Sequence, residues 1–466
     1  MSTFNDIDFL LQNEHGKKLY QQTAVLLPVI DPHNHIDPAS LATNKKFENL
    51  YQLWVQNDPY KHRAMRICGI AEDLITGAMP DYEKFLAWAG CFAHTAGNPL
   101  FHWCCMELKR VFGIDEILSP GNAKQIWGTA NSIITAGNFG ALDIVKSLGV
   151  EMLCTSDDLL DSLEQHRALA AQKSTVACLP SLRSDSIISF GQPSFYGWLQ
   201  KLQTLCSTPI TNLESYKTAV IERLNFFDEA GCLLSDHSLD SGFVYTSAYQ
   251  GSPEVVFNKL LQKQVLENDE LISLQSHLLY FLGKEYAARN WKMQLHIGAY
   301  RYTNTNLRNK LGPAGGYACI GGTVHVPSLC LFLDELDTEN ALPKTILYTL
   351  NPADNTVLAS ITGSYAQDGV QGKIQFGPAW WYNDHFEGIT QQLLALSSYG
   401  LLGTAIGFTT DSRSILSLTR HDYYRRILCN LIGSWVEQGK LPNDEDFLSN
   451  LIKNISYHNI KNWIIK

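Results

Sequence analysis

Short apolar segments recur along most of the chain, and stretches long enough for a helix separate most of them. Residues 253–289 and 389–401 are examples of such stretches. Near-continuous apolar strands that alternate with helices are typical of a parallel sheet covered by helices, and eight of them favour a closed (β/α)8 barrel. The candidate strands are residues 25–30, 150–154, 175–179, 231–234, 293–296, 345–350, 373–376 and 404–408.

The region between the first two candidate strands, about residues 39–150, has helix-like patterning with several breaks. The sequence contains no linker rich in Pro, Gly or Ser, no repeat and no low-complexity tract. We therefore expect a single α/β domain over residues 1–466, a TIM-type barrel with a helical insertion at about 39–150 packed over one end.

Asp58 and Pro59 predict the start of a helix within this insertion, because proline is tolerated in the first helical turn. Tyr60, Arg63 and Arg66 follow at spacings that place neighbouring members on one helical face. This face could bind a ligand at the barrel mouth, or it could be a solvated basic face with a packing tyrosine.

Composition restricts the partners of the chain. Its 36 Lys and Arg against 46 Asp and Glu give a net charge of −10, which argues against nucleic acid or an anionic membrane surface. The eleven cysteines are scattered without a Cys-x-x-Cys motif, which favours reduced core thiols. The polar start of the chain lacks the features of a signal peptide, and no apolar stretch approaches the roughly 18–20 residues of a membrane span. We expect a cytoplasmic protein.

Polar residues follow each candidate strand at its carboxyl end, where barrel enzymes build their active sites. Helix caps account for part of this pattern, since βα loops commonly end in Asp, Asn, Ser or Thr, but caps do not account for the histidines and arginines. These polar residues are His33 and His35, Thr155, Asp157 and Asp158, Arg183, Asp236 and His237, His296 and Arg301, Asn351, Asp354 and Asn355, Trp380, Trp381 and Asp384, and Asp411 and Arg413.

His33 and His35 form a His-x-His motif directly after the first candidate strand. Alternate residues of an extended chain point to the same face, so the two imidazoles could bind one metal ion; alternatively, they could be turn histidines bonded to backbone carbonyls. Asp411 follows the last candidate strand, which lies beside the first in a closed barrel. The three residues together predict a metal site, and His296 is a further candidate, either as a ligand or as a group that binds substrate.

Six segments in this order along the chain make it resemble the uronate isomerase family of the amidohydrolase superfamily. Pro32, Asn34 and Tyr382 depart from the pattern of that family, and they bear on which uronate is preferred. The matching segments are residues 31–35 (Asp-Pro-His-Asn-His), 60–66, 295–301, 350–355, 372–381 and 410–414.

The resemblance implies a barrel enzyme that converts D-glucuronate to D-fructuronate and D-galacturonate to D-tagaturonate. It implies that His33, His35 and Asp411 bind a divalent metal, with zinc as the expected ion. The residues that it implies for the substrate site are Tyr60, Arg183, Asp236, His296, Arg301 and Arg413.

Aldose–ketose isomerisation through an enediol needs a base, a stabiliser of the enediolate oxygen and a binding group for the distant carboxylate of the sugar. A metal can polarise the oxygens, and arginines suit the carboxylate. Tyr60 and Asp411 are the candidate bases, and Tyr60 would need neighbouring positive charge to lower its pKa. We expect Asp236 or His296 to bind hydroxyl groups, and Trp380 and Trp381 to form either a wall for the sugar or part of the core.

Two other classes remain open at this stage. One is a metal-dependent hydrolase on the same barrel, although the fourth strand ends in Arg-Ser-Asp or Ser-Asp-His rather than in the bridging lysine of a two-metal site, and the arginines favour a carboxylate. The other is a sugar-acid binding protein with a structural metal, which would be closed by four protein ligands. In every case we expect a small-molecule partner and a homo-oligomer, because barrels of this size often associate.

Overall fold

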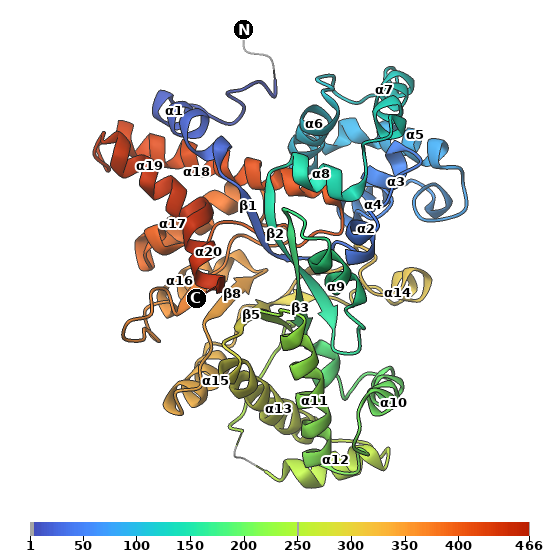
Figure 1. Cartoon of the computed structure of the whole chain (residues 1–466), viewed down its shortest axis with the longest axis vertical. Helices are drawn as coiled ribbons and strands as arrows, with labels where there is room; N and C mark the ends of the chain where they lie inside the picture. The colour runs from blue at the N-terminus through green and yellow to red at the C-terminus, as the bar shows by residue number, and fades with distance from the viewer. Residues whose placement is uncertain (1–3, 249–250, 466) are drawn as a thin grey trace.

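The computed structural model describes residues 4–248 and 251–465, and its central element is a parallel sheet of seven strands (Figure 1). The strands are ordered β1-β2-β3-β4-β5-β8-β9, so that each pairs with the next of the sheet along the chain, as in a (β/α)8 barrel. They are β1 (Val29–Asn34), β2 (Val150–Asp158), β3 (Ala177–Arg183), β4 (Leu234–Leu239), β5 (Lys292–Ile297), β8 (Thr345–Thr349) and β9 (Ile374–Phe376).

Seven of the predicted strands overlap strands of the sheet, although the first of them, β1, begins only at Val29, after a 3-10 turn. The strand predicted at residues 404–408 is wrong: residues 402–404 form another 3-10 turn, and the following residues join no strand ladder. Side chains bind the carbonyl groups there instead of a neighbouring strand. Asn459 donates to the carbonyls of Gly403 and Ala405, and Gln375 donates to that of Thr404.

The chain nevertheless occupies the eighth position of the barrel a few residues later. The amide of Asp411 donates to the carbonyl of His33 at 3.0 Å, and the amide of His35 donates to the carbonyl of Ser412 at 2.9 Å. These two bonds join the last βα segment to the end of β1 and bring the beginning and the end of the barrel together.

Helices separate the strands and cover the outside of the sheet, and α2 to α8 gather on one side of it between β1 and β2 (Figure 1). In α4, Asp58 caps the helix by accepting from the amides of Tyr60 and Lys61, and Pro59 is the first helical residue, which confirms the predicted helix start. The helices before β2 are α1 (Glu14–Gln22), α2 (Pro38–Ala42), α3 (Leu50–Trp54), α4 (Pro59–Ile67), α5 (Asp81–Phe92), α6 (Pro99–Phe112), α7 (Ala123–Thr135) and α8 (Ala141–Ser147).

The later helices surround the rest of the sheet, and a short antiparallel pair, β6 (Ala299–Tyr300) and β7 (Cys319–Ile320), follows β5. No helix of the described residues has the length and apolarity to cross a membrane. These helices are α9 (Glu164–Ala171), α10 (Phe195–Leu205), α11 (Leu213–Glu229), α12 (Pro253–Leu261), α13 (Asn268–Ala288), α14 (Thr305–Leu311), α15 (Val326–Thr338), α16 (Asn355–Ile361), α17 (Phe386–Tyr399), α18 (Arg420–Glu437), α19 (Glu445–Lys453) and α20 (Asn459–Ile465).

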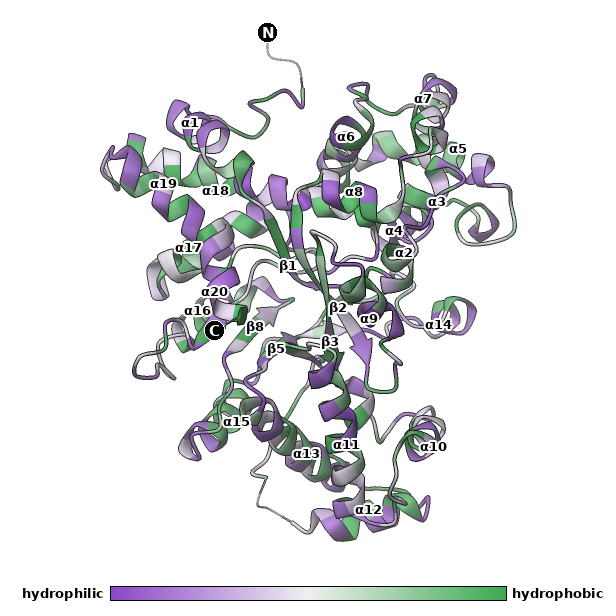
Figure 2. Ribbon diagram, in the orientation of Figure 1, coloured by the Kyte–Doolittle hydropathy of each residue, from purple (hydrophilic) through white to green (hydrophobic). Residues whose placement is uncertain are grey.

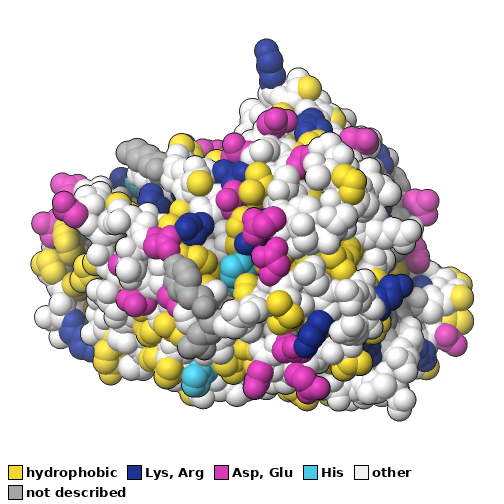
Figure 3. All heavy atoms as spheres, turned by 90° about the horizontal axis from the view of Figure 1, so that it is seen from below, with side chains coloured by type: hydrophobic (Ala, Val, Ile, Leu, Met, Phe, Trp, Pro, Cys, Tyr) yellow, Lys and Arg dark blue, Asp and Glu magenta, His cyan; other side chains and the backbone are white. Residues whose placement is uncertain are grey.

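Apolar side chains fill both faces of the sheet, and Figure 2 shows β1 and β2 as largely hydrophobic. Inside the barrel, Ile30, Leu234 and Ile346 pack with Ile460 and Trp463 of α20. The indole of Trp463 also donates to the carbonyl of Gly372, just before β9. The last helix therefore closes the amino-terminal end of the barrel and leaves the carboxyl end for a site. On the face shown in Figure 3, acidic and basic side chains are interspersed.

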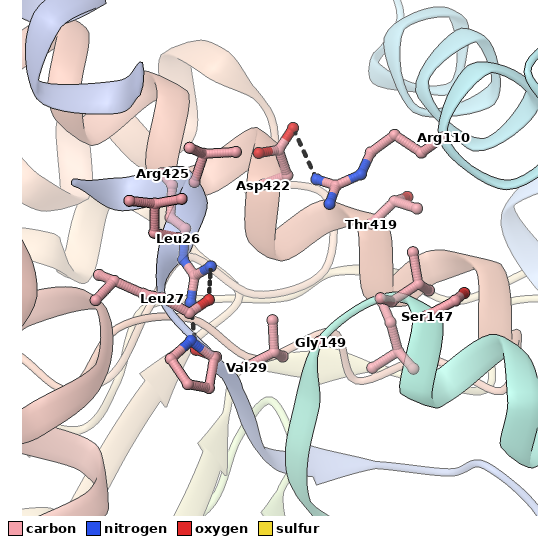
Figure 4. A pocket seen from close by; sticks show the side chains of 13 residues that line it. Leu26, Leu27, Val29, Arg110, Ser147, Gly149, Thr419, Asp422 and Arg425 are labelled. Carbon is pink, nitrogen blue, oxygen red and sulfur yellow. Dashed lines mark hydrogen bonds and ion pairs between the residues drawn. The ribbon is translucent and has the colours of Figure 1, made fainter. Parts of the chain in front are cut away.

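Arg425 of α18 fixes the start of β1. It lines a cavity of about 280 Å³ at the amino-terminal ends of β1 and β2 (Figure 4). Arg425 is 5% exposed, and its guanidinium donates to the carbonyls of Leu27 at 2.7 Å and Pro28 at 2.5 Å. Arg110 pairs separately with Asp422 at 3.0 Å. Arg425 thus holds the strand that carries His33.

We expect Arg425→Met to lower the free energy of unfolding by about 2–3 kcal/mol, because it leaves two carbonyl groups without donors and removes a buried cation that packs against them. Arg110→Met is the matched control; it removes a partly exposed ion pair and should cost less than about 1 kcal/mol. Urea denaturation measures both. Equal losses for the two variants would contradict the anchoring role of Arg425.

Candidate metal centre and substrate cavity

A cavity of about 450 Å³ opens at the carboxyl ends of the strands, and every residue proposed from the sequence for metal or substrate lines it. Most come from β1, β3, β4 and β5 or from the turns after the strands, while Tyr60 reaches the cavity from α4 of the insertion. These residues are His33, His35, Tyr60, Arg183, Asp236, His296, Arg301, Trp380, Trp381, Asp411 and Arg413.

Three of these side chains converge on one point. Oδ1 of Asp411 lies 3.1 Å from Nε2 of His33 and 2.9 Å from Nε2 of His35, and ligand atoms of the three residues lie within 4.8 Å of one another. Oδ1 of Asp411 is buried and has no hydrogen-bond partner among the described residues, whereas Oδ2 accepts from the indole of Trp380. Two imidazole nitrogens and a carboxylate oxygen form a donor set that fits zinc and its first-row neighbours.

The backbone holds Asp411 in an unusual conformation, with a φ of 44°. Such a conformation is costly for a residue other than glycine, and it persists where the surroundings enforce it. Asp31 of β1 supplies this enforcement, since it accepts from the hydroxyl of Thr409 at 2.8 Å and from the hydroxyl and amide of Thr410. The sequence did not indicate this role of Asp31, which lies two residues before His33.

The protonation states of His35 and Asp411 suit a cation at this point. Burial lowers the pKa of His35 to about 4, so its imidazole is neutral near pH 7. Burial alone would raise the pKa of Asp411, but the neighbouring His33 and His35 bring it well below its ordinary value, so the carboxylate is ionised. A metal ligand must be a neutral imidazole or an ionised carboxylate, and His35 and Asp411 meet this condition. Burial alone would lower the pKa of His33, but the charges of Asp411 and Asp236 raise it above its ordinary value, so His33 must release any proton that it carries when a metal binds.

His296 lies beside the three converging side chains, 4.4 Å from the ring of His33 between centroids, and stacks on Tyr348 at 4.6 Å. It is not part of the cluster whose ligand atoms come together, and its buried Nε2 has no hydrogen-bond partner among the described residues. Burial lowers the pKa of His296 well below its ordinary value, so it presents a neutral ring. His296 is therefore better placed to bind substrate than to act as a metal ligand.

Three arginines surround the cavity, but they differ in what they contact. Arg183 donates to Ser156 at 3.1 Å and to Nδ1 of His35 at 2.6 Å, and Arg301 pairs with Asp240 at 2.8 Å. Arg413 forms no hydrogen bond or ion pair with any described residue. Burial and the charge of Arg183 lower the pKa of Arg413. Two guanidinium groups without a carboxylate partner thus share one cavity, which suits an anionic group of a ligand.

Tyr60 donates its phenolic hydrogen to Oδ2 of Asp384 at 3.1 Å. Burial raises the pKa of Tyr60 well above its ordinary value, and the charge of Asp384 adds to this rise. The charge of Arg420 opposes this rise but does not bring the pKa of Tyr60 below its ordinary value, so Tyr60 is a neutral phenol. Trp380 is 3% exposed and belongs to the core, whereas Trp381 is partly exposed and lies 5.1 Å from the guanidinium of Arg301.

The sequence did not indicate the loop between α14 and β7, residues 313–318, which also lines the cavity. Arg63 and Arg66 of α4 hold this loop. Arg63 donates to the carbonyls of Gly316 at 3.0 Å and Ala318 at 3.1 Å, and Arg66 donates to the carbonyl of Gly315. The two arginines of α4 therefore fasten a wall of the cavity, and Arg63 itself also lines the cavity.

The fold and site define a class: a (β/α)8 barrel with a candidate His-His-Asp metal centre at the carboxyl ends of its strands. Comparison with known proteins narrows this class. The model of the glucuronate isomerase family matches residues 1–464, and the chain belongs to that family. It is thereby a member of a family of isomerases.

Individual relatives agree over the full length. The chain is 44% identical over 465 residues to the uronate isomerase of Caldanaerobacter subterraneus subsp. tengcongensis, with 100% of both chains covered. It is 43% identical to the uronate isomerase of Bacillus licheniformis, over 99% of this chain and 98% of that protein. The crystal structure of the Thermotoga maritima uronate isomerase superposes with a TM-score of 0.93 at 29% identity, covering 99% and 100% of the two chains.

We expect His33→Gln to weaken zinc binding at least about 100-fold, because it removes one of three donors that converge on a single point. His94→Gln, which changes an exposed histidine of the insertion, is the control and should leave the affinity unchanged. Equilibrium dialysis against zinc, with the bound metal quantified by mass spectrometry, measures both. Equal zinc affinities for His33→Gln and the parent protein would show that the three side chains do not form the site.

Proposed function

We propose that this protein is a uronate isomerase that interconverts D-glucuronate with D-fructuronate and D-galacturonate with D-tagaturonate. One observation carries the proposal: the cavity that contains the converging His33, His35 and Asp411 also contains Arg413, whose guanidinium has no partner among the residues that the structure describes. The same cavity thus offers a metal centre for the carbonyl end of the substrate and a cation for its carboxylate end. Membership of the glucuronate isomerase family and the names of the relatives support the assignment.

His33, His35 and Asp411 are the residues that would hold the metal, for which we propose zinc. When bound, the metal would act as a Lewis acid that polarises the oxygens on C1 and C2 of the sugar.

Arg413 and Arg183 bind the carboxylate of the sugar in this proposal. Arginine presents two parallel N–H donors to a carboxylate, and the mutual repulsion of two nearby guanidinium groups is relieved when an anion lies between them. The bonds of Arg183 to Ser156 and His35 fix its orientation before substrate arrives. His296 presents a neutral imidazole to the sugar hydroxyls.

Asp236 is a further hydroxyl-binding group in this proposal, and it is 3% exposed. Its Oδ2 accepts from Ser156 at 2.8 Å and lies 3.7 Å from Nδ1 of His33, so it joins the arginine side of the cavity to the metal side. Burial raises the pKa of Asp236 above its ordinary value, which makes proton sharing with a sugar hydroxyl easier.

Tyr60 and Asp411 carry the proton between the two carbons. Asp411 is ionised, and Tyr60 is a neutral phenol whose hydrogen already points to Asp384. A neutral phenol takes up a proton only if it can pass its own proton on. The proton acceptor beyond Tyr60 is therefore part of the chemistry of the site.

We expect the zinc-loaded protein to convert D-glucuronate to fructuronate in heavy water, with solvent deuterium at C1 of the ketose, because an enediol path exchanges the transferred proton. Proton NMR follows the reaction, and D-galacturonate is tested in parallel. Ketose without deuterium would still support the assignment as an isomerase, but the mechanism would then be a hydride shift or a transfer of a proton shielded from solvent. If neither uronate gave ketose, the proposal would fail, and release of acid or ammonia from amides and lactones would then test a hydrolase.

We expect Arg413→Met to raise the KM for D-glucuronate about 10- to 150-fold, since a charged hydrogen bond to the carboxylate contributes about 1.5–3 kcal/mol. Arg289→Met is the control; Arg289 pairs with Glu285 away from the cavity, and its loss should leave KM unchanged. Steady-state kinetics on both variants give the comparison. An unchanged KM in Arg413→Met would remove Arg413 from carboxylate binding.

A further inference from the structure

Asp384 lies behind Tyr60, in the turn between β9 and α17, and is 4% exposed. Its Oδ2 accepts from Tyr60 Oη at 3.1 Å and from Nη1 of Arg420 at 3.4 Å. Its Oδ1 is buried and has no hydrogen-bond partner among the described residues. The residue is not among those lining the cavity of the site, so any effect on the substrate passes through Tyr60.

Arg420, at the start of α18, supports this carboxylate from the other side and is 1% exposed. Its guanidinium lies 3.8 Å from the ring centroid of Trp103 and 5.1 Å from that of Tyr60. Nε and Nη2 have no hydrogen-bond partner among the described residues. Arg420 is thus enclosed by aromatic rings, with Asp384 as its ion-pair partner.

A buried ion pair with several atoms that lack hydrogen-bond partners contributes little to stability. Desolvation of the two charges often exceeds their attraction, and apolar replacements of similar volume are frequently as stable. Buried polar groups without partners call for another explanation, of which a role in catalysis is one. The pair is also in contact with Tyr60, the phenol to which the proposed function assigns a proton transfer.

We infer that Asp384, backed by Arg420, is a positioning residue that orients Tyr60 and accepts its phenolic proton during isomerisation. The inference rests on the proposed function and extends it. When Tyr60 Oη accepts a proton from the sugar, its own O–H bond breaks and that proton moves to Oδ2 of Asp384. The reverse shift restores the phenol when the proton is returned to the neighbouring carbon. Protons and charge balance, and no other reactant takes part.

The surroundings of Asp384 set the pH range of this relay. Tyr60 faces it from α4, Arg420 and Tyr423 from α18, and Tyr382 and His385 from its own segment. Burial raises the pKa of Asp384 to about 6, against the opposing effect of Arg420. The carboxylate is ionised and can accept a proton above this pH. Turnover should therefore fall as the pH drops through about 6.

The test uses the zinc-loaded full chain with D-glucuronate, and compares Asp384→Asn, Tyr60→Phe and the double variant. We expect Asp384→Asn to lower kcat about 100-fold or more with KM nearly unchanged, because it removes a proton acceptor and leaves substrate contacts in place. The fall of kcat near pH 6 should disappear, and the double variant should be no slower than Tyr60→Phe alone, because the two residues act in one relay. Asp384→Glu should regain part of the rate and the acid limb.

Asp354→Asn is the matched control, because Asp354 is another buried carboxylate after a strand, 2% exposed, and does not line the cavity. It should leave the pH profile unchanged. The relay would be overturned if the losses of kcat in Asp384→Asn and Tyr60→Phe multiplied in the double variant. It would also be overturned if the kcat of the wild type stayed constant between about pH 5 and about pH 7, and this second test does not require Asp384→Asn to fold. Absence of ketose from the wild type contradicts the proposed function and the relay together, whereas conversion with an unaffected Asp384→Asn contradicts only the relay.

Discussion

The join between the end of β1 and residues 409–412 is the constraint on which the site depends. It closes the barrel without a regular strand. The amide of Asp411 donates to the carbonyl of His33, the amide of His35 donates to the carbonyl of Ser412, and Asp31 binds the hydroxyls of Thr409 and Thr410. These contacts force Asp411 into its left-handed conformation and direct its carboxylate at His33 and His35. Two segments nearly 380 residues apart in the chain thus form one metal centre, as the separation of Thr409 from Asp31 shows. A regular eighth strand would alternate its side chains along the join and would not need such a backbone.

The sequence predicted the parts of this arrangement that depend on local pattern. Apolar runs between helices located the strands of the sheet, and the family resemblance is confirmed by the match over residues 1–464. The rule that barrel sites form at the carboxyl ends of strands located the polar residues that line the cavity. The predicted strand that the structure contradicts depends on contacts with residues distant in the sequence. Residues 404–408 have a strand composition, but Asn459 and Gln375 bind their carbonyl groups. The roles of the residues remain predictions until they are tested.

Arginines show the same limit of sequence reasoning. Arg63 and Arg413 are equally basic in the sequence, yet Arg63 is bound to the carbonyls of the 313–318 loop and Arg413 has no partner in the described part of the chain. Only the fold separates a guanidinium that builds the wall of a cavity from one that is left for a ligand. In a protein of net charge −10, an exposed arginine without a partner among the described residues, next to a second arginine, suits an anionic ligand.

The distribution of unsatisfied polar atoms separates an enzyme from a protein with a structural metal. A structural zinc site is closed by four ligands whose hydrogen bonds are complete, whereas a catalytic site keeps an open position. Here three ligand atoms converge. Within the described part of the chain, the buried atoms without hydrogen-bond partners include Nδ1 of His33, Nε2 of His296, Oδ1 of Asp384 and Oδ1 of Asp411. Each of these atoms costs stability unless a ligand or a transferred proton engages it. Those of His33, His296 and Asp411 belong to residues that line the cavity of the site, and the strained backbone of Asp411 is of a kind that clusters at functional sites.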